Sequence, residues 1–382
     1  MNKYVKRYLI DAMSGMAQGL FASLLIGTII KTLGQQLLRI SVNPVFQFLV
    51  NAGNFATDAH VVGAAMAIGI GFAMKVPALV LFSLVAVGSA ANVTGGAGGP
   101  LAVLVIAIIA AEVGCLVSKK TKVDIIVTPA ITILVGALLT VLTAKYIGMA
   151  ASSIGKVIVW ATKLHPFWMG MLVSAIVGIA LTLPISSAAI CAAFGLTGLA
   201  GGAAVAGCCA QMVGFAILSF RENKWGGILS QGLGTSMLQM PNIIKNPKVW
   251  IPPTLASIIT GPIATCLFKM EMNGAAVSSG MGTCGLVGQI GVISGWFEPS
   301  EVAIGHGAAA ITPGALDWIG LILVCFILPG VLSWAFGLLL RKIGWIKDGD
   351  LSLDVQEKQT PAKVESTTTT ANTTTEQTEN KE

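Results

Sequence analysis

Two glycine-rich segments decide how this chain folds: AAICAAFGLTGLAG at residues 188–201 and AAVSSGMGTCGLVG at residues 275–288. Aligned without gaps, they are identical at six of fourteen positions, and Ile/Val, Phe/Met and Thr/Cys exchanges preserve the size class at others. In a membrane protein, paired apolar segments broken by glycine indicate a transporter whose binding site lies near the middle of the bilayer. Because glycine, alanine and leucine are abundant in the chain, a chance match is the alternative interpretation.

The composition requires a lipid environment. Of the 382 residues, 54% are hydrophobic and 10% are charged, and the mean hydropathy is +0.82. A soluble domain carries about 25% charged residues, so this chain has too little polar surface to cover a globule in water. The formal net charge of +6 therefore marks cytoplasmic loops and does not indicate a nucleic-acid partner.

Windows of about 20 mostly apolar residues predict membrane-spanning helices. They occur at roughly 9–30, 58–75, 76–94, 100–118, 125–148, 166–185, 202–220, 254–270 and 315–340. The segments 186–201 and 274–295 are too interrupted to be ordinary spans. We expect 186–220 to form one re-entrant hairpin that enters and leaves from the cytoplasm, and 274–296 to form a second that dips in from outside. We further expect 31–57 and 149–165 to be amphipathic, and 221–253 to be a polar loop. The fold class is an all-α polytopic membrane protein.

The basic residues predict the orientation in the membrane. If the N-terminal segment is an uncleaved first span with its start inside, nearly every basic cluster falls on the cytoplasmic side, with Lys156 and Lys163 as exceptions. The two glycine-rich copies then enter from opposite faces, as alternating access requires. We therefore expect a multi-pass protein of the bacterial cell membrane with both termini in the cytoplasm.

The same pattern predicts three parts. Residues 1–165 form an N-terminal transmembrane half for scaffolding or dimerisation, and residues 166–346 form a C-terminal half with the hairpins and the solute site. Residues 347–382 are rich in Thr, Glu, Lys and Gln and are expected to be a disordered cytoplasmic tail.

Glu298 is the strongest candidate for a solute ligand. It lies in GWFEP, residues 295–299, after the second copy, where Pro299 stops a helix and Trp296 and Phe297 offer flat apolar faces. A carboxylate accepts hydrogen bonds from sugar hydroxyls, while aromatic rings stack on the C–H faces of a sugar. The segment therefore predicts a site for a sugar-like solute, and an interfacial loop glutamate is the alternative.

The remaining candidates surround the two copies or lie at membrane depth. Gln211 lies 87 positions before Glu298, the same offset as the copies, and is the expected polar counterpart in the first hairpin. His306 would donate to a hydroxyl or respond to pH. We expect four glycines to line the site: Gly195, Gly198, Gly282 and Gly285. The alternative is that they only allow helices to pack closely. The secondary candidates, with capping or solvation as the alternative, are Asp58, His60, Glu112, Asn242 and Glu301.

The sequence offers no phosphate-binding loop, metal-ligand spacing or catalytic triad. We therefore expect no cofactor, no metal ion and no autonomous enzyme activity. The seven cysteines, mostly inside apolar stretches, are expected to be buried and structural.

Two stretches carry a family resemblance: GLGTSMLQMPNIIKNPKVWIPPTL at 232–255 and GMGTCGLVGQIG at 280–291. They resemble the membrane component, EIIC, of bacterial phosphotransferase-system sugar permeases, and more narrowly the stand-alone group that includes the perfringolysin O regulators. The resemblance covers about residues 5–345. It implies a glucose-superfamily fold of about ten spans with two hairpins and a homodimer. It also implies that the sugar is phosphorylated by a separate EIIB component, with EIIA as a further separate partner.

The resemblance also implies a role for Glu298, because GWFEP matches the Gly-x-x-Glu-Pro outline whose glutamate binds sugar hydroxyls in that superfamily. Trp296 and Phe297 stand where the family usually has small or branched residues, which leaves the substrate open. Two other functions remain alternatives. One is a membrane sensor that keeps the fold and regulates gene expression, and the other is an ion-coupled transporter that uses Glu112 and Asp58.

Overall fold

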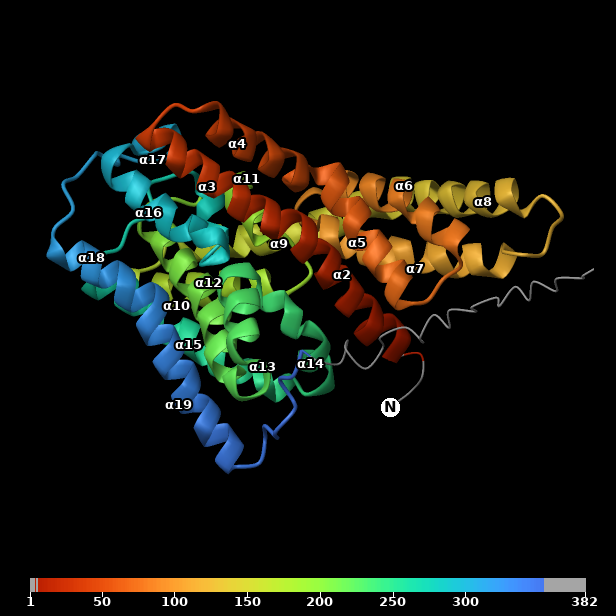
Figure 1. Cartoon of the computed structure of the whole chain (residues 1–382). Helices are drawn as coiled ribbons and strands as arrows, with labels where there is room; N and C mark the ends of the chain where they lie inside the picture. The colour runs from red at the N-terminus through yellow and green to blue at the C-terminus, as the bar shows by residue number, and fades with distance from the viewer. Residues whose placement is uncertain (1–3, 5, 354–382) are drawn as a thin grey trace, which may run out of the picture.

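The computed structural model of the chain describes residue 4 and residues 6–353 (Figure 1). Over these residues the chain is helical, apart from turns and an isolated antiparallel bridge between Gly198 and Met272. The predicted all-α class is confirmed for this part of the chain.

The N-terminal half contains long, nearly continuous helical stretches. Its elements are η1 (Lys6–Asp11), α2 (Ala12–Leu20), η2 (Phe21–Leu25), α3 (Ile26–Ile40), α4 (Pro44–Thr57), α5 (Ala59–Ala73), α6 (Ala78–Gly95), η3 (Gly96–Gly98), α7 (Gly99–Val117), α8 (Asp124–Leu139), η4 (Thr140–Ala144) and α9 (Lys145–Ala161). The region 31–57, expected to be amphipathic, forms most of α3 and all of α4, which pack side by side along one edge of the molecule (Figure 1).

The C-terminal half is more broken. Its elements are α10 (Pro166–Thr182), α11 (Ser187–Ala193), α12 (Gly198–Leu218), α13 (Phe220–Gly227), η5 (Ile228–Gly234), η6 (Ser236–Gln239), α14 (Met240–Lys245), η7 (Pro247–Trp250), α15 (Ile251–Pro262), η8 (Ile263–Leu267), η9 (Ala276–Gly280), η10 (Cys284–Leu286), α16 (Val287–Phe297), α17 (Glu301–Gly305), α18 (Ala315–Ile322), η11 (Leu323–Ile327) and α19 (Leu328–Lys342). The breaks fall in and around the two glycine-rich copies, as their composition predicts.

Local capping explains where α4 and α5 meet. The side chain of Asn43 accepts a hydrogen bond from the Val45 amide, with Pro44 in the first helical position. The side chain of Asp58 accepts one from the His60 amide at 2.9 Å, so the chain stops one helix and starts the next at Asp58. The two helices are bent by 55° at this point. Asp58, a secondary candidate for solute binding, therefore has the capping role that was its alternative.

The helices pack as two bundles (Figure 1). In the N-terminal bundle, α2, α5, α6, α7 and α8 pack together, and small residues allow very close approach. For example, a Cβ atom added to Gly15 would lie 2.1 Å from the carbonyl oxygen of Gly69. In the C-terminal bundle, α10, α15 and α19 surround α12, whose side chains are almost all buried.

Six helical stretches are long and apolar enough to cross a membrane, or seven if the bent pair α4–α5 is one span. They are 6–40, 78–117, 124–161, 198–218, 247–267 and 315–342. The number is lower because the predicted spans 76–94 and 100–118 join into the single stretch 78–117, and α10, predicted as the span 166–185, is shorter than a span. The larger predicted number of spans therefore stays a prediction.

The region 221–253, predicted to be a polar loop, is instead folded into short helices. Its amides are buried and bonded to one another: Gln239 Nε2 donates to Gln231 Oε1 at 2.8 Å, and Asn242 Nδ2 donates to Gln239 Oε1 at 2.8 Å. The same amides hold the end of the described chain, because Gln239 Nε2 also donates to the carbonyl of Leu351 at 3.0 Å. The expectation of a loop at 221–253 was wrong because a buried network of hydrogen-bonded amides needs the same polar residues as an exposed loop.

The predicted tail begins at residue 347, yet residues 347–353 pack against the C-terminal bundle. The Leu351 side chain is fully buried, and Asn223 bonds to both the carbonyl of Leu351 and the amide of Leu353, each at 2.8 Å. The rest of the predicted tail, 354–382, lies outside the described residues.

Candidate functional site

The two glycine-rich copies adopt the same backbone conformation at equivalent positions. Gly195 and Gly282, which align with each other, have φ angles of +59° and +53°, and the next aligned pair, Gly198 and Gly285, has +65° and +52°. Only glycine reaches this left-handed region without a steric cost. The shared geometry supports a true internal repeat, in which a short helical piece is broken by two glycines and followed by a longer helix.

The two copies also contact each other. The Ser187 hydroxyl, directly before the first copy, donates to the carbonyl of Gly280 in the second at 2.7 Å, and the Ser279 hydroxyl of the second copy donates to the carbonyl of Leu196 in the first at 2.6 Å. These hydroxyls satisfy carbonyls that the broken helices leave free, as backbone at membrane depth requires. The breaks are thus a joint structure made by both copies.

A cavity of about 360 Å³, here called the central cavity, lies where the copies meet the N-terminal half. Its walls include residues 186–189 at the start of the first copy, Met281 and Cys284 of the second copy, and Thr57 and Asn92 of the N-terminal half. Among the described residues that line it, none is charged or aromatic. Its chemistry therefore suits a neutral solute that hydroxyl and amide groups orient.

Asn92 was not predicted as a site residue. Its Nδ2 donates to the carbonyl of Ala59 at 2.8 Å. Its Oδ1 accepts no hydrogen bond from a described residue, which leaves a free acceptor at the cavity wall. The signal in the sequence is its place just before Gly95 and Gly96, a third glycine break beside a span. The Thr94 that follows makes this stretch look like an ordinary polar turn.

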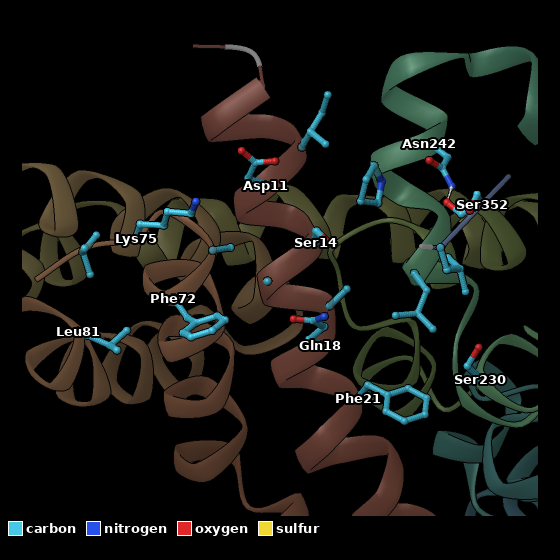
Figure 2. Close-up of a pocket in the computed structure, with 18 residues that line it drawn as sticks. Asp11, Ser14, Gln18, Phe21, Phe72, Lys75, Leu81, Ser230, Asn242 and Ser352 are labelled. Carbon is cyan, nitrogen blue, oxygen red and sulfur yellow. Dashed lines mark hydrogen bonds between the residues drawn. The ribbon is translucent and has the colours of Figure 1, made fainter. Parts of the chain in front are cut away.

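Figure 2 shows the residues that line a larger cavity of about 900 Å³, here called the vestibule. Its walls come from α2, from the turn after α5, from α14 and from residues 352 and 353; the polar or charged side chains among them are Asp11, Ser14, Gln18, Lys75, Ser230, Asn242 and Ser352. The two cavities have adjacent lining residues, since Leu20 and Met237 line the central cavity while Phe21 and Leu238 line the vestibule. Together they outline a route between the two bundles.

Gln211 lies behind the wall of the central cavity. It is fully buried, and its Oε1 accepts from Trp250 Nε1 at 2.9 Å and from Thr182 Oγ1 at 3.2 Å. Its Nε2 donates to Thr254 and Ser257. Both ends of the Gln211 amide therefore hold α10, α12 and α15 together in this conformation. Contact between Gln211 and a solute stays a prediction.

The predicted residues after the second copy lie at the end of the molecule opposite α14 and the N-terminus (Figure 1). Glu298 and Glu301 are exposed, and neither lines the vestibule or the central cavity. His306 Nδ1 lies 3.0 Å from Thr197 Oγ1, which joins this region to the first copy.

Trp296 is buried against Trp318 and lines a third pocket, of about 230 Å³, here called the distal pocket. Two carboxylates, Glu271 and Asp317, and the amide Asn273 also line it. An aromatic ring beside carboxylates is the arrangement that the sequence predicted for Glu298, but here other carboxylates provide it.

Two other secondary candidates have partners within the fold. Glu112 pairs with Arg7 at 2.8 Å, which supplies the polar partner that its depth in a span demands. His60 Nδ1 lies 2.8 Å from Ser89 Oγ. Over the described residues, no group of three or more His, Cys, Asp or Glu side chains is placed to hold a metal ion.

A family model described as "Phosphotransferase system, EIIC" matches residues 10–353. Neither the curated proteins nor the solved structures contain a match to the chain. The family match ends at the last described residue, which agrees with the packing of residues 347–353 into the fold. Since it covers most of the chain, the protein belongs to the EIIC family of the phosphotransferase system and is a multi-pass membrane protein of that transporter family.

Proposed function

We propose that the protein is a permease that moves a sugar-like solute between the two bundles by alternating access. The observation that carries the proposal is the matched pair of glycine breaks, whose segments contact each other beside the central cavity. The four matched glycines are not among the residues that line this cavity, whereas Ala188, Met281 and Cys284 of the two copies are. Discontinuous helices that meet at a cavity are how membrane transporters present free backbone groups to a polar solute. The EIIC match supports a solute as the cargo.

The proposal includes the finer topology. The segment 186–220 and the segment 274–296 act as re-entrant hairpins from opposite faces, within a fold of about ten crossings. The N- and C-terminal regions lie in the cytoplasm. In support, four regions that the charge pattern assigns to the cytoplasm, near Asp11, Lys75, Asn242 and Ser352, line one vestibule.

Sugar-like chemistry is proposed from the distal pocket. The carboxylates of Glu271 and Asp317 accept hydroxyl hydrogen bonds, and the Trp296 indole offers an apolar face. We propose that this pocket receives the solute on the side opposite the vestibule, with Glu298 and His306 beside it as further hydroxyl ligands. The central cavity, without charges among its described walls, then passes a neutral molecule onward.

Coupling is proposed from the family. A solute that reaches the vestibule would be phosphorylated there by separate EIIB and EIIA proteins, and the permease would work as a homodimer. The EIIC match supports this part of the proposal.

The test is uptake of labelled sugars into proteoliposomes that contain the purified protein, with and without a phosphoenolpyruvate-driven set of EIIA and EIIB proteins inside. Stimulation of uptake by the complete set, for one or a few sugars, is the expected result. Equal uptake without the set, driven by an ion gradient, would favour ion-coupled transport. Absence of uptake with every sugar would overturn the permease proposal.

One observation favours the sensor alternative. Ser352 and Leu353 line the vestibule and lead directly into the last part of the chain. Solute in the vestibule would therefore contact the residues that tether this part of the chain. A transcript response that persists in a variant without uptake would favour the sensor.

A further inference from the structure

A groove of about 530 Å³ lies between the start of α13 and the last two turns of α19, away from the cavities described above. Its described walls are Arg221, Ala335, Leu338, Leu339, Arg341 and Lys342. One side is thus cationic and the other aliphatic, and both belong to the C-terminal bundle.

Two of the three cations have no partner in the described part of the chain. Arg341 is held by Glu222 at 2.8 Å and by Asp348 at 2.7 Å, so its charge is already balanced. Arg221 and Lys342 are exposed, and their side chains form no ion pair or hydrogen bond with a described residue. The groove therefore keeps about two unbalanced positive charges at its rim.

The surroundings of the groove are apolar and exposed. Along α19, Val331, Trp334 and Leu339 are each more than half exposed. Beside Arg221, Trp225 is 72% exposed and packs edge-to-face against Phe220 with ring centroids 5.7 Å apart. In a membrane protein such side chains contact acyl chains, and a tryptophan beside basic residues marks the depth of the headgroups.

We propose that this groove is a binding site for an anionic phospholipid. Its headgroup phosphate lies between Arg221 and Lys342, and its acyl chains lie along Leu338, Leu339 and Trp334. Basic pockets between membrane helices have this specificity because the guanidinium and ammonium groups bind phosphate while the helix faces bind lipid tails. A free phosphate ion shares the headgroup chemistry but makes no use of the aliphatic wall.

The site also ties two distant parts of the chain together. Arg341 lines the same groove as the two free cations and holds Asp348 of the C-terminal segment. A lipid that bridges α13 and α19 would therefore stabilise the position from which this segment departs. The inference does not depend on which solute is transported.

The experiment uses the full-length protein, stripped of native lipid in a neutral detergent. Phosphatidylglycerol or phosphatidylcholine is titrated back, and bound lipid is counted by native mass spectrometry while the unfolding temperature is followed. We expect retention of phosphatidylglycerol with a rise in unfolding temperature, and little effect of phosphatidylcholine. The double variant Arg221→Gln with Lys342→Gln should weaken phosphatidylglycerol binding by about tenfold or more.

The matched control removes two exposed cations elsewhere, Lys120→Gln with Lys122→Gln, which do not line the groove. It should bind phosphatidylglycerol like the unmodified protein. Equal phosphatidylglycerol binding by the groove variant, or equal binding of both lipids, would overturn the proposal. A stabilisation by inorganic phosphate as large as that by phosphatidylglycerol would identify a free-anion site instead of a lipid site. Solute uptake is a separate readout, so loss of the permease function leaves this test intact.

Discussion

The Ser187 hydroxyl donates a 2.7 Å hydrogen bond to the carbonyl of Gly280, and this bond joins two segments that lie 93 positions apart in the chain. Replacing Ser187 with alanine would leave the Gly280 carbonyl without that partner in a buried environment. We expect a loss of about 1–3 kcal/mol in stability, measured as a lower unfolding temperature in detergent. Ser153→Ala, which removes an exposed hydroxyl from α9, is the control and should have little effect.

Replacing the glycines with left-handed backbone by alanine should lower the stability by different amounts at different positions. Gly198 has open space around an added Cβ, so Gly198→Ala tests the backbone alone and should cost about 1–2 kcal/mol. Gly282→Ala should cost more, because its Cβ would also lie 2.7 Å from the Cβ of Cys208.

The measurement is thermal unfolding of these two variants and of Gly226→Ala as the control. At Gly226 an added Cβ meets nothing within 4 Å, and φ is not in the left-handed region. A Gly198→Ala protein as stable as the Gly226→Ala protein would contradict the assigned strain.

Glu298→Gln tests the solute ligand that the sequence predicts. Because a hydrogen bond to a charged group contributes about 1.5–3 kcal/mol, we expect solute affinity to fall by about tenfold or more. Stability should not change, since the side chain is exposed and forms no hydrogen bond or ion pair with a described residue. Sugar binding to the purified protein is the measurement, and the unfolding temperature of the variant shows that the fold is intact. Unchanged affinity would remove Glu298 from the site.

The Arg7–Glu112 ion pair should couple the N-terminal helix to α7. Both side chains are about one-third exposed, so screening limits the pair to a coupling energy of about 1 kcal/mol or less. A double-mutant cycle of Arg7→Gln and Glu112→Gln, followed by unfolding temperature, measures it. Strictly additive effects would show that the two groups do not interact.

The C-terminal segment predicts different outcomes for two truncations. Ending the chain after residue 353 keeps Leu351 and its bonds to Asn223 and Gln239, so stability should be retained. Ending it after residue 346 removes a fully buried leucine, a loss of about 1.5–3 kcal/mol from its burial alone. Equal unfolding temperatures for the two truncated proteins would contradict this packing.

The glycine breaks could be predicted from the sequence because their cause is local. Four glycines at matched positions allow a backbone that other residues avoid, and the structure has that backbone at all four. The apolar windows also gave the helical class, although joined helices such as α6 and α7 changed the number of candidate spans.

The partners across the fold could not be predicted, since they depend on distant contacts. Arg7 meets Glu112 across 105 positions, and Asn242 meets the carbonyl of Ser352 across 110. The periodicity of apolar residues along the chain does not predict which distant residues form such pairs. For the same reason the sequence pointed to Glu298 beside Trp296, whereas Glu271 and Asp317, from two other segments, share the pocket of that ring.

The vestibule has a consequence for biosynthesis. One wall is contributed by Ile10 and Asp11, and another by Ser352 and Leu353, so it is enclosed by nearly the first and the last described residues. Chains are made from the N-terminus, and contacts between distant residues form only after both have been synthesised. The route between the bundles is therefore completed only after translation has passed residue 353. A ribosome that stalls earlier leaves an incomplete passage in the bilayer.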